Sequence, residues 1–150
     1  MTRSKKGILL SQRKYKFDLL LKVEMLRCGS IDTPMDENTR LLSDHGQLFE
    51  DIGRYMRMVK KLNYLTVTKP NITFAISVVS HFLSASRTTH LEVVIRILRY
   101  LKKDLRIGLF YSDHGHTRVA GFSDTDWAGC LFDRRLTTEY CVFLGENLVS

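Results

Sequence analysis

The periodicity of the apolar residues changes once along the chain, and this change restricts the fold to few architectures. Between residues 54 and 103, apolar side chains recur every three to four residues, which is the spacing of amphipathic helices. From residue 107 onward they alternate or cluster in short runs rich in aromatic and β-branched types, as in strands. This order predicts an α+β fold in which a helical cluster precedes an antiparallel sheet. A last strand is expected to begin only at Leu148 of the 150 residues, so the sheet is predicted to be truncated.

Three helices are predicted in the helical region. The first spans residues 54–66 and carries one apolar face: Tyr55, Met58, Val59, Leu62 and Leu65. Pro70 disfavours helical geometry at the residue before it, so a second helix starts afresh there, with Asn71 as its predicted cap. The third spans residues 89–103.

The amino-terminal third of the chain is less regular. A short strand over residues 7–11 precedes a predicted helix over residues 12–26. Residues 28–53 show no sustained period and contain proline, glycine, asparagine and several aspartates. We interpret them as a long loop, and loops of this length are commonly functional or disordered.

Charge is distributed unevenly. The chain has 23 Lys and Arg against 16 Asp and Glu. Residues 54–106 hold eleven bases and two acids, whereas residues 28–53 hold six acids and one base. Two helical rows of bases share the spacing i, i+3 and i+7: Arg54, Arg57 and Lys61, then Arg96, Arg99 and Lys103. Such rows favour a polyanionic partner, although the solvated face of a basic protein has the same pattern.

Several classes of protein are excluded or disfavoured. No apolar run approaches the roughly 20 residues of a membrane-spanning helix, so no membrane partner is expected. The apolar run near the amino terminus is too short for a signal peptide. The cysteines are odd in number and far apart, which favours a reducing compartment: Cys28, Cys130 and Cys141. We therefore expect an intracellular protein that is not secreted.

Candidates for chemistry are few. Phosphate-loop, nucleophile-elbow and His-Glu-x-x-His motifs are absent. Asp124 follows an apolar strand, and strand-borne carboxylates hold the metal ions of two-metal phosphoryl-transfer sites. Asp124 and Asp126 come from one element, however, and a turn-initiating aspartate is the alternative interpretation. His114 and His116 have metal-ligand spacing in an apparent turn, where two histidines are more often solvated than ligating.

Six segments, in order and with preserved spacing, resemble the Pol polyproteins of copia-type retrotransposons. The most distinctive are Arg-Ile-Leu-Arg-Tyr-Leu, which ends at Leu101, and Ser-Asp-Thr-Asp-Trp-Ala-Gly, which begins at Ser123. The family has Ser-Asp-Ala-Asp-Trp-Ala-Gly at the latter position. The six segments are distributed over essentially the whole chain: residues 7–15, 32–35, 57–65, 68–72, 90–101 and 123–129.

The resemblance implies a fragment of Pol that joins the end of the reverse transcriptase to the start of the ribonuclease H. Residues 1–53 would be the end of the polymerase palm with a long loop, and residues 54–106 the helical thumb and connecting region. Residues 107–150 would be an incomplete ribonuclease H domain. Asp124 would then be the first metal-binding carboxylate of the nuclease, a catalytic residue and a ligand of Mg²⁺.

The remaining carboxylates of that site, and the polymerase's Tyr-x-Asp-Asp pair, have no counterpart in this chain. The family is one of RNA-directed DNA polymerases and ribonucleases H, but we expect this chain to be inactive and not to bind Mg²⁺ functionally. Lys60 and Glu139 stand where the family has glycine, which suggests relaxed constraint. Restoration of the site by a second polypeptide that supplies the missing carboxylates is a further alternative.

The expected residual function is weak, electrostatic binding of an RNA·DNA hybrid. Five bases are the predicted phosphate contacts: Arg57, Lys61, Arg96, Arg99 and Lys103. The alternative is a non-catalytic cellular module, derived from a transposon, that binds nucleic acid or protein.

Overall fold

Helices and strands occupy separate parts of the chain. The computed structural model describes residues 1–36, 39, 41, 44–126 and 137–149. Residues 11–108 form a helical unit, and residues 1–10 together with residues 109–150 form a strand unit. The α+β fold predicted from the change of period is confirmed.

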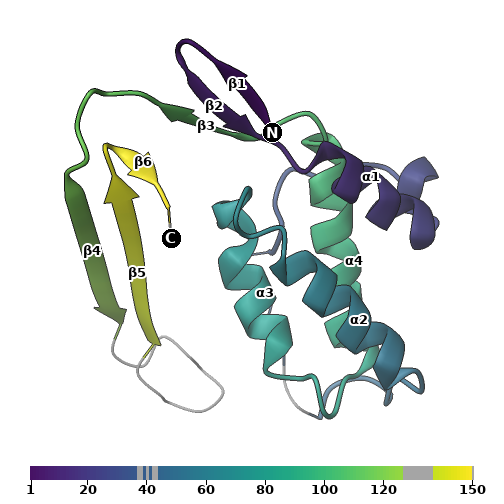
Figure 1. Ribbon diagram of the computed structural model, residues 1–150. Coiled ribbons are helices and arrows are strands. Elements are labelled where there is room, and N and C mark those ends of the chain that lie inside the picture. The colour runs from purple at the N-terminus through teal and green to yellow at the C-terminus, as the bar shows by residue number, and fades with distance from the viewer. Residues whose placement is uncertain (37–38, 40, 42–43, 127–136, 150) are drawn as a thin grey trace. The chain divides into compact units, whose positions relative to one another are not determined.

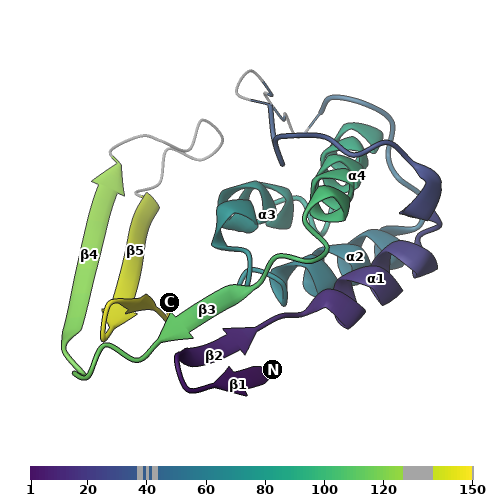
Figure 2. The same ribbon diagram turned by 90° about the horizontal axis from the view of Figure 1, so that it is seen from above.

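The described part of the helical unit contains four α-helices and two 3₁₀ turns (Figure 1): α1 (Arg13–Lys22), η1 (Met25–Arg27), α2 (Ile52–Asn63), η2 (Pro70–Ile72), α3 (Thr73–Ser80) and α4 (Thr88–Lys103). α4 packs against the other three α-helices, and both views show it beside α3 (Figure 1 and Figure 2). The described residues between η1 and α2 form no helix or strand, as predicted, although Leu48 makes an isolated bridge to Arg87.

Two predicted helix ends are wrong. The helix expected to reach residue 26 ends at Lys22, because Glu24 has a left-handed φ of 59° and the chain continues as η1. Asn71 is not a helix cap: it lies inside η2, and its amide donates to the Tyr100 hydroxyl. By contrast, Asp51 caps α2 through a carboxylate that accepts from the Arg54 N–H at 2.8 Å.

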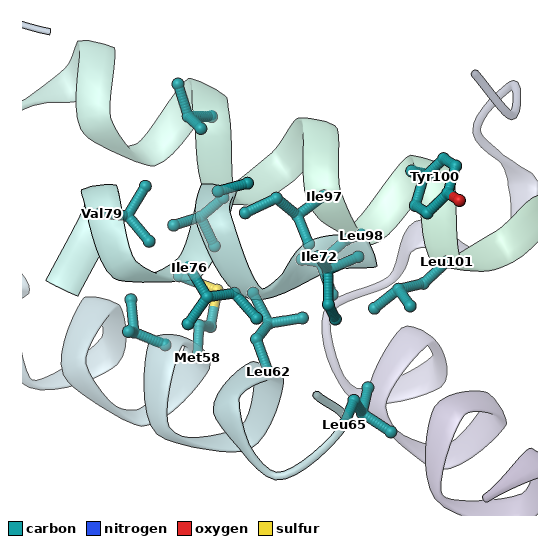
Figure 3. Close-up of a cluster of buried hydrophobic side chains, with 14 of the residues drawn as sticks. Met58, Leu62, Leu65, Ile72, Ile76, Val79, Ile97, Leu98, Tyr100 and Leu101 are labelled. Atoms are coloured by element: carbon teal, nitrogen blue, oxygen red, sulfur yellow. The ribbon is translucent and has the colours of Figure 1, made fainter. Parts of the chain in front are cut away.

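The core of the helical unit lies between α2, α3 and α4. Figure 3 shows Met58 and Leu62 from α2 pointing toward Ile76 and Ile97 from the two other helices. These four side chains are at most 6% exposed. The apolar face predicted for the first helix is buried at every position, so the helical period is confirmed there.

Tyr55 is a polar group inside this core. Its side chain is fully buried, and its hydroxyl donates to the Val79 carbonyl at 2.8 Å. This bond joins α2 to the end of α3 and satisfies a polar group that would be costly to bury alone. Burial raises the pKa of the Tyr55 phenol well above its usual value of 10.0.

We expect Tyr55 to make stability depend on pH above about pH 10. The folded protein keeps the phenolic proton where the unfolded chain has lost it, so this stabilisation is complete below that pH and is lost as the pH rises. Tyr55→Phe should lower the free energy of unfolding by about 0.5–1.5 kcal/mol at neutral pH. As the pH rises above about 10, the variant should lose less of its remaining stability than the wild type does. Urea unfolding across this range measures both effects.

Burial also lowers the pKa of the Lys16 amine below its usual value, so Lys16 gives stability a pH dependence of its own. Lys16 is present in both proteins, so the difference between their plots of unfolding free energy against pH comes from Tyr55. Parallel curves for the wild type and Tyr55→Phe would contradict the prediction.

The strand unit contains two antiparallel three-stranded sheets in its described part. One has the order β1 (Thr2–Ser4), β2 (Gly7–Leu10) and β3 (Leu109–Ser112). The other has the order β4 (Val119–Asp126), β5 (Thr137–Leu144) and β6 (Asn147–Leu148), with β5 in the middle (Figure 1). Gly7 is required where β2 meets β3, because a Cβ at its φ of 148° would lie 2.1 Å from the Tyr111 carbonyl oxygen.

The strands that follow residue 107 all have partners in the described part of the structure. β3 pairs with β2 from the amino terminus, with Leu10 opposite Leu109 and Gly7 opposite Ser112. The apolar segment 140–144 pairs with β4 along its whole length. Asn147 then connects the two sheets: its side chain accepts from the Ser112 N–H at 2.7 Å and donates to the Ser112 carbonyl at 2.8 Å.

Candidate functional site

Asp124 lies inside β4, which continues to Asp126, and not after the strand as the sequence predicts. Its register partner on β5 is Glu139. The side chains of both residues, and the whole of Trp127, fall outside the description of the structure. Mg²⁺ is held in proteins by several oxygen ligands that converge on one point. No group of three or more potential metal-ligating side chains gathers among those that the structure describes. The described donors therefore do not fit the ion, and the metal-binding role of Asp124 stays a prediction.

The row of bases on α2 faces outward. Arg54 and Arg57 are exposed and Lys61 is half-buried, whereas Tyr55, Met58, Val59 and Leu62 on the opposite side form part of the core. The Arg57 side chain is 67% exposed, and its guanidinium lies 4.0 Å from the Asp51 carboxylate. The structure pairs Lys61 with no carboxylate among the residues that it describes. The predicted contacts Arg57 and Lys61 are thus brought together on one accessible helix face.

The row on α4 has a different environment, because part of the acidic loop lies over it. The Lys103 amine donates to the Asp32 carboxylate at 2.6 Å. Arg96 donates to the Thr33 hydroxyl at 2.8 Å, and its guanidinium lies 3.9 Å from the Asp36 carboxylate. The hydrogen bond from Lys103 holds the pKa of the Asp32 carboxyl below its usual value.

Arg99 and its neighbour Lys102 bind the same loop through backbone carbonyls. Arg99 Nε donates to the Gly29 carbonyl at 2.8 Å, and the Lys102 amine donates to the Cys28 carbonyl. All three bases predicted on α4 therefore already have acceptors within the chain. The segment that supplies these acceptors has no period of its own, so the sequence offered only its acidic composition as a signal.

Two buried lysines escaped the sequence analysis. Lys16 is 1% exposed, and its amine donates to the Ile107 carbonyl at 2.7 Å and to the Asp104 carbonyl at 3.0 Å. Lys69 is 5% exposed, and its amine donates to the Asp104 carboxylate at 2.6 Å. Burial, and then the nearby charge of Lys69, lower the pKa of the Lys16 amine. Both lysines hold the carboxyl end of α4, where cations offset the helix dipole.

The two histidines that are two residues apart share a carboxylate. His114 Nδ1 lies 3.7 Å from Glu146, and His116 Nε2 lies 3.6 Å from the other oxygen of the same side chain. Each histidine side chain is about a third exposed, which fits the interpretation that they are solvated.

None of the helices in the described part of the chain is long and apolar enough to cross a bilayer.

Comparison with known proteins gives three relatives of interest. An uncharacterized mitochondrial protein of Arabidopsis thaliana is 33% identical over 144 residues, which cover 96% of this chain and 60% of that protein. The retrovirus-related Pol polyprotein from transposon RE1 of the same plant is 35% identical over 144 residues, 96% of this chain but 10% of the polyprotein. A secreted RxLR effector protein of Plasmopara viticola is 37% identical over 97 residues, 64% of this chain and 68% of the effector.

No protein-family model and no solved structure matches the chain. The chain spans less than two thirds of the mitochondrial relative and one tenth of the polyprotein. The segment of Pol to which it corresponds, and its compartment, therefore stay predictions. The match to Pol polyproteins nevertheless extends over nearly all of its residues, with 30–35% identity to three of them. Over nearly its whole length, the chain is therefore homologous to the Pol polyproteins of copia-type retrotransposons.

Proposed function

We propose that the chain binds an RNA·DNA hybrid through its phosphates, without catalysis, and that α2 provides the accessible contact surface. The observation that carries the proposal is the charge of α2. Within the helix, four bases and no acids occupy the sequence: Arg54, Arg57, Lys60 and Lys61. Its apolar face is fixed in the core, so the basic face is held toward solvent.

The length of the row suits a nucleic-acid backbone. Arg54 and Lys61 are seven residues apart, which corresponds to about 10 Å along a helix. Each strand of B-form DNA presents one phosphate about every 3.4 Å along the axis of the duplex. The row can therefore follow about three nucleotides and neutralise their phosphates, which favours binding through the release of counterions.

The relationship to Pol supports nucleic acid as the polyanion. The proposal includes the assignment of residues 54–106 to the thumb and connecting region and of residues 107–150 to an incomplete ribonuclease H domain. Phosphate contacts fix position without reading sequence, so affinity should be similar for hybrids of different sequence. The protein contributes charge and a fixed helix face, and no step through a metal ion is part of the proposal.

A second candidate function is protein binding through the strand unit. On β4 and β5, three of the described apolar side chains are more than 60% exposed: Val119, Phe122 and Tyr140. This observation favours the alternative of a transposon-derived module that binds a protein.

The test of hybrid binding is the salt dependence of charge-neutralised variants. Arg57→Gln/Lys61→Gln should lower the slope of log affinity against log salt concentration by about two, one for each lost phosphate contact. Fluorescence anisotropy of a labelled hybrid measures this slope. Lys5→Gln/Lys6→Gln removes the same charge from two exposed lysines between β1 and β2 and should leave the slope unchanged. Equal slopes in both variants would contradict the assignment to α2.

A further inference from the structure

The segment 28–36, which we call the strap, lies on the basic row of α4 and is tied to it mainly by polar contacts. Its residues include two acids and no base. Lys103 holds the Asp32 carboxylate at 2.6 Å, and Arg96 holds the Thr33 hydroxyl at 2.8 Å. Arg99 adds a bond to the Gly29 carbonyl at 2.8 Å. The row on α4 is thus occupied by oxygen acceptors, the same kind of atom that a phosphate group presents.

These ties are exposed to water. The Asp32 side chain is 85% exposed and the Lys103 side chain 50%, although the two atoms are in close contact. For the pair Arg96 and Asp36, the values are 35% and 51%. Exposed ion pairs are weak and are screened by salt, so they compete poorly with a ligand of higher charge density.

The strap also leaves the row incompletely satisfied. Arg96 Nε is buried and donates to no acceptor among the described residues. A hollow of about 510 Å³ lies between the loop and α4, and its lining includes Ile31, Leu41, Val93 and Arg96. Ile31 and Met35 provide apolar anchors against the core, and both are only partly buried. The strap therefore contacts the rest of the helical unit at separate positions and does not fill the space between itself and α4.

The masked row has the same geometry as the accessible one. Arg96, Arg99 and Lys103 repeat the spacing of Arg54, Arg57 and Lys61, so each row spans about two turns of helix. A polyanion that binds one row has charges at the spacing that the other row requires. The strap offers only two acids to the row on α4. A competing polyanion carries one negative charge on every phosphate.

We propose that α4 carries a second polyanion-binding row, which the strap masks, and that a phosphate chain displaces the strap to reach it. This inference rests on the proposed function, because it concerns the same class of ligand. It adds an internal competitor, so the affinity of the chain for polyanions is set partly by its own acidic segment.

The test uses a probe on the strap itself. Cys28 is exposed, and a nitroxide attached to it in a Cys130→Ser/Cys141→Ser background reports whether the strap is held. Inorganic polyphosphate is the polyanion. Asp32→Asn/Asp36→Asn should increase the motion of the label without any ligand and should raise the affinity for polyphosphate about 2- to 30-fold, the effect of removing two exposed pairs. In the unmutated strap, polyphosphate itself should increase the motion of the label.

Asp44→Asn/Glu50→Gln is the matched control. Both residues are exposed in the same acidic loop outside the strap, and the change in net charge is the same. The control should leave the label immobile and should raise affinity less. Lys103→Gln removes a tie from the other side: it should release the label without a gain in affinity. Circular dichroism verifies that each variant is folded.

The two proposals fail differently. If the strap variant and the control bind polyphosphate equally and the label stays immobile, the masked row is refuted, while the α2 variants still report on hybrid binding. If the label is released but affinity does not rise above that of the control, α4 is not a binding row and the inference is again overturned. Loss of all salt-dependent binding in the wild type would instead refute the proposed function.

Discussion

Asp104→Asn should lower the free energy of unfolding by about 3–5 kcal/mol, the usual cost of breaking a buried ion pair from one side. The Asp104 carboxylate is only 18% exposed and lies 2.6 Å from the Lys69 amine, whose side chain is 6% exposed. The Lys16 amine binds the backbone carbonyl of the same residue at 3.0 Å. The substitution removes the carboxylate that offsets the charge of the Lys16 and Lys69 amines. Two buried ammonium groups then remain close to each other without a negative partner.

Urea unfolding followed by far-ultraviolet circular dichroism measures this loss. Asp44→Asn makes the same chemical change at an exposed position and should stay within about 0.5 kcal/mol of the wild type. Removing both partners, in Asp104→Asn/Lys69→Met, should recover part of the stability, because no ammonium is then left unpaired at position 69. A single variant as stable as the control would show that the pair does not stabilise the fold.

Leu62→Ala should lower the free energy of unfolding by about 2–5 kcal/mol. Leu62 has no exposed surface, and Figure 3 shows it among side chains from α3 and α4. The substitution removes apolar contacts and leaves a cavity where three helices meet, and the surrounding side chains can fill such a cavity only partly.

The matched control is Val67→Ala, because Val67 is apolar but 55% exposed. It should change the unfolding free energy by no more than about 0.5 kcal/mol. Urea midpoints at equal slope give the comparison directly. Similar losses at Leu62 and Val67 would contradict the assignment of the core to the interface of α2, α3 and α4.

The sequence predicted the helical core well because burial in a helix repeats every 3.6 residues and can be recognised locally. Leu62 and the rest of its face follow this rule. The end of α1 could not be predicted, since the left-handed conformation of Glu24 does not change the spacing of the apolar residues. The pairing of Gly7 with Ser112 joins residues about a hundred positions apart, and local pattern does not specify such partners.

In the candidate site, too, local pattern predicts some features and long-range contacts determine the others. The rows on α2 and α4 follow from helical spacing, so their bases were found together. The sequence does not predict the contacts of Arg96, Arg99 and Lys103 with the strap. A segment without a period gives no information about which surface it covers. Lys16 was also missed: a lysine is normally exposed, and only the fold places it beside the carbonyls that end α4.

The most direct test of binding without catalysis is a gel-shift titration of a hybrid with a labelled RNA strand, in Mg²⁺ and over a range of salt concentrations. We predict a retarded band that weakens as salt rises and an RNA strand of unchanged length after release. Binding that does not depend on salt would contradict the phosphate contacts on α2. A shortened RNA strand that appears only with Mg²⁺ would show that the chain is a nuclease.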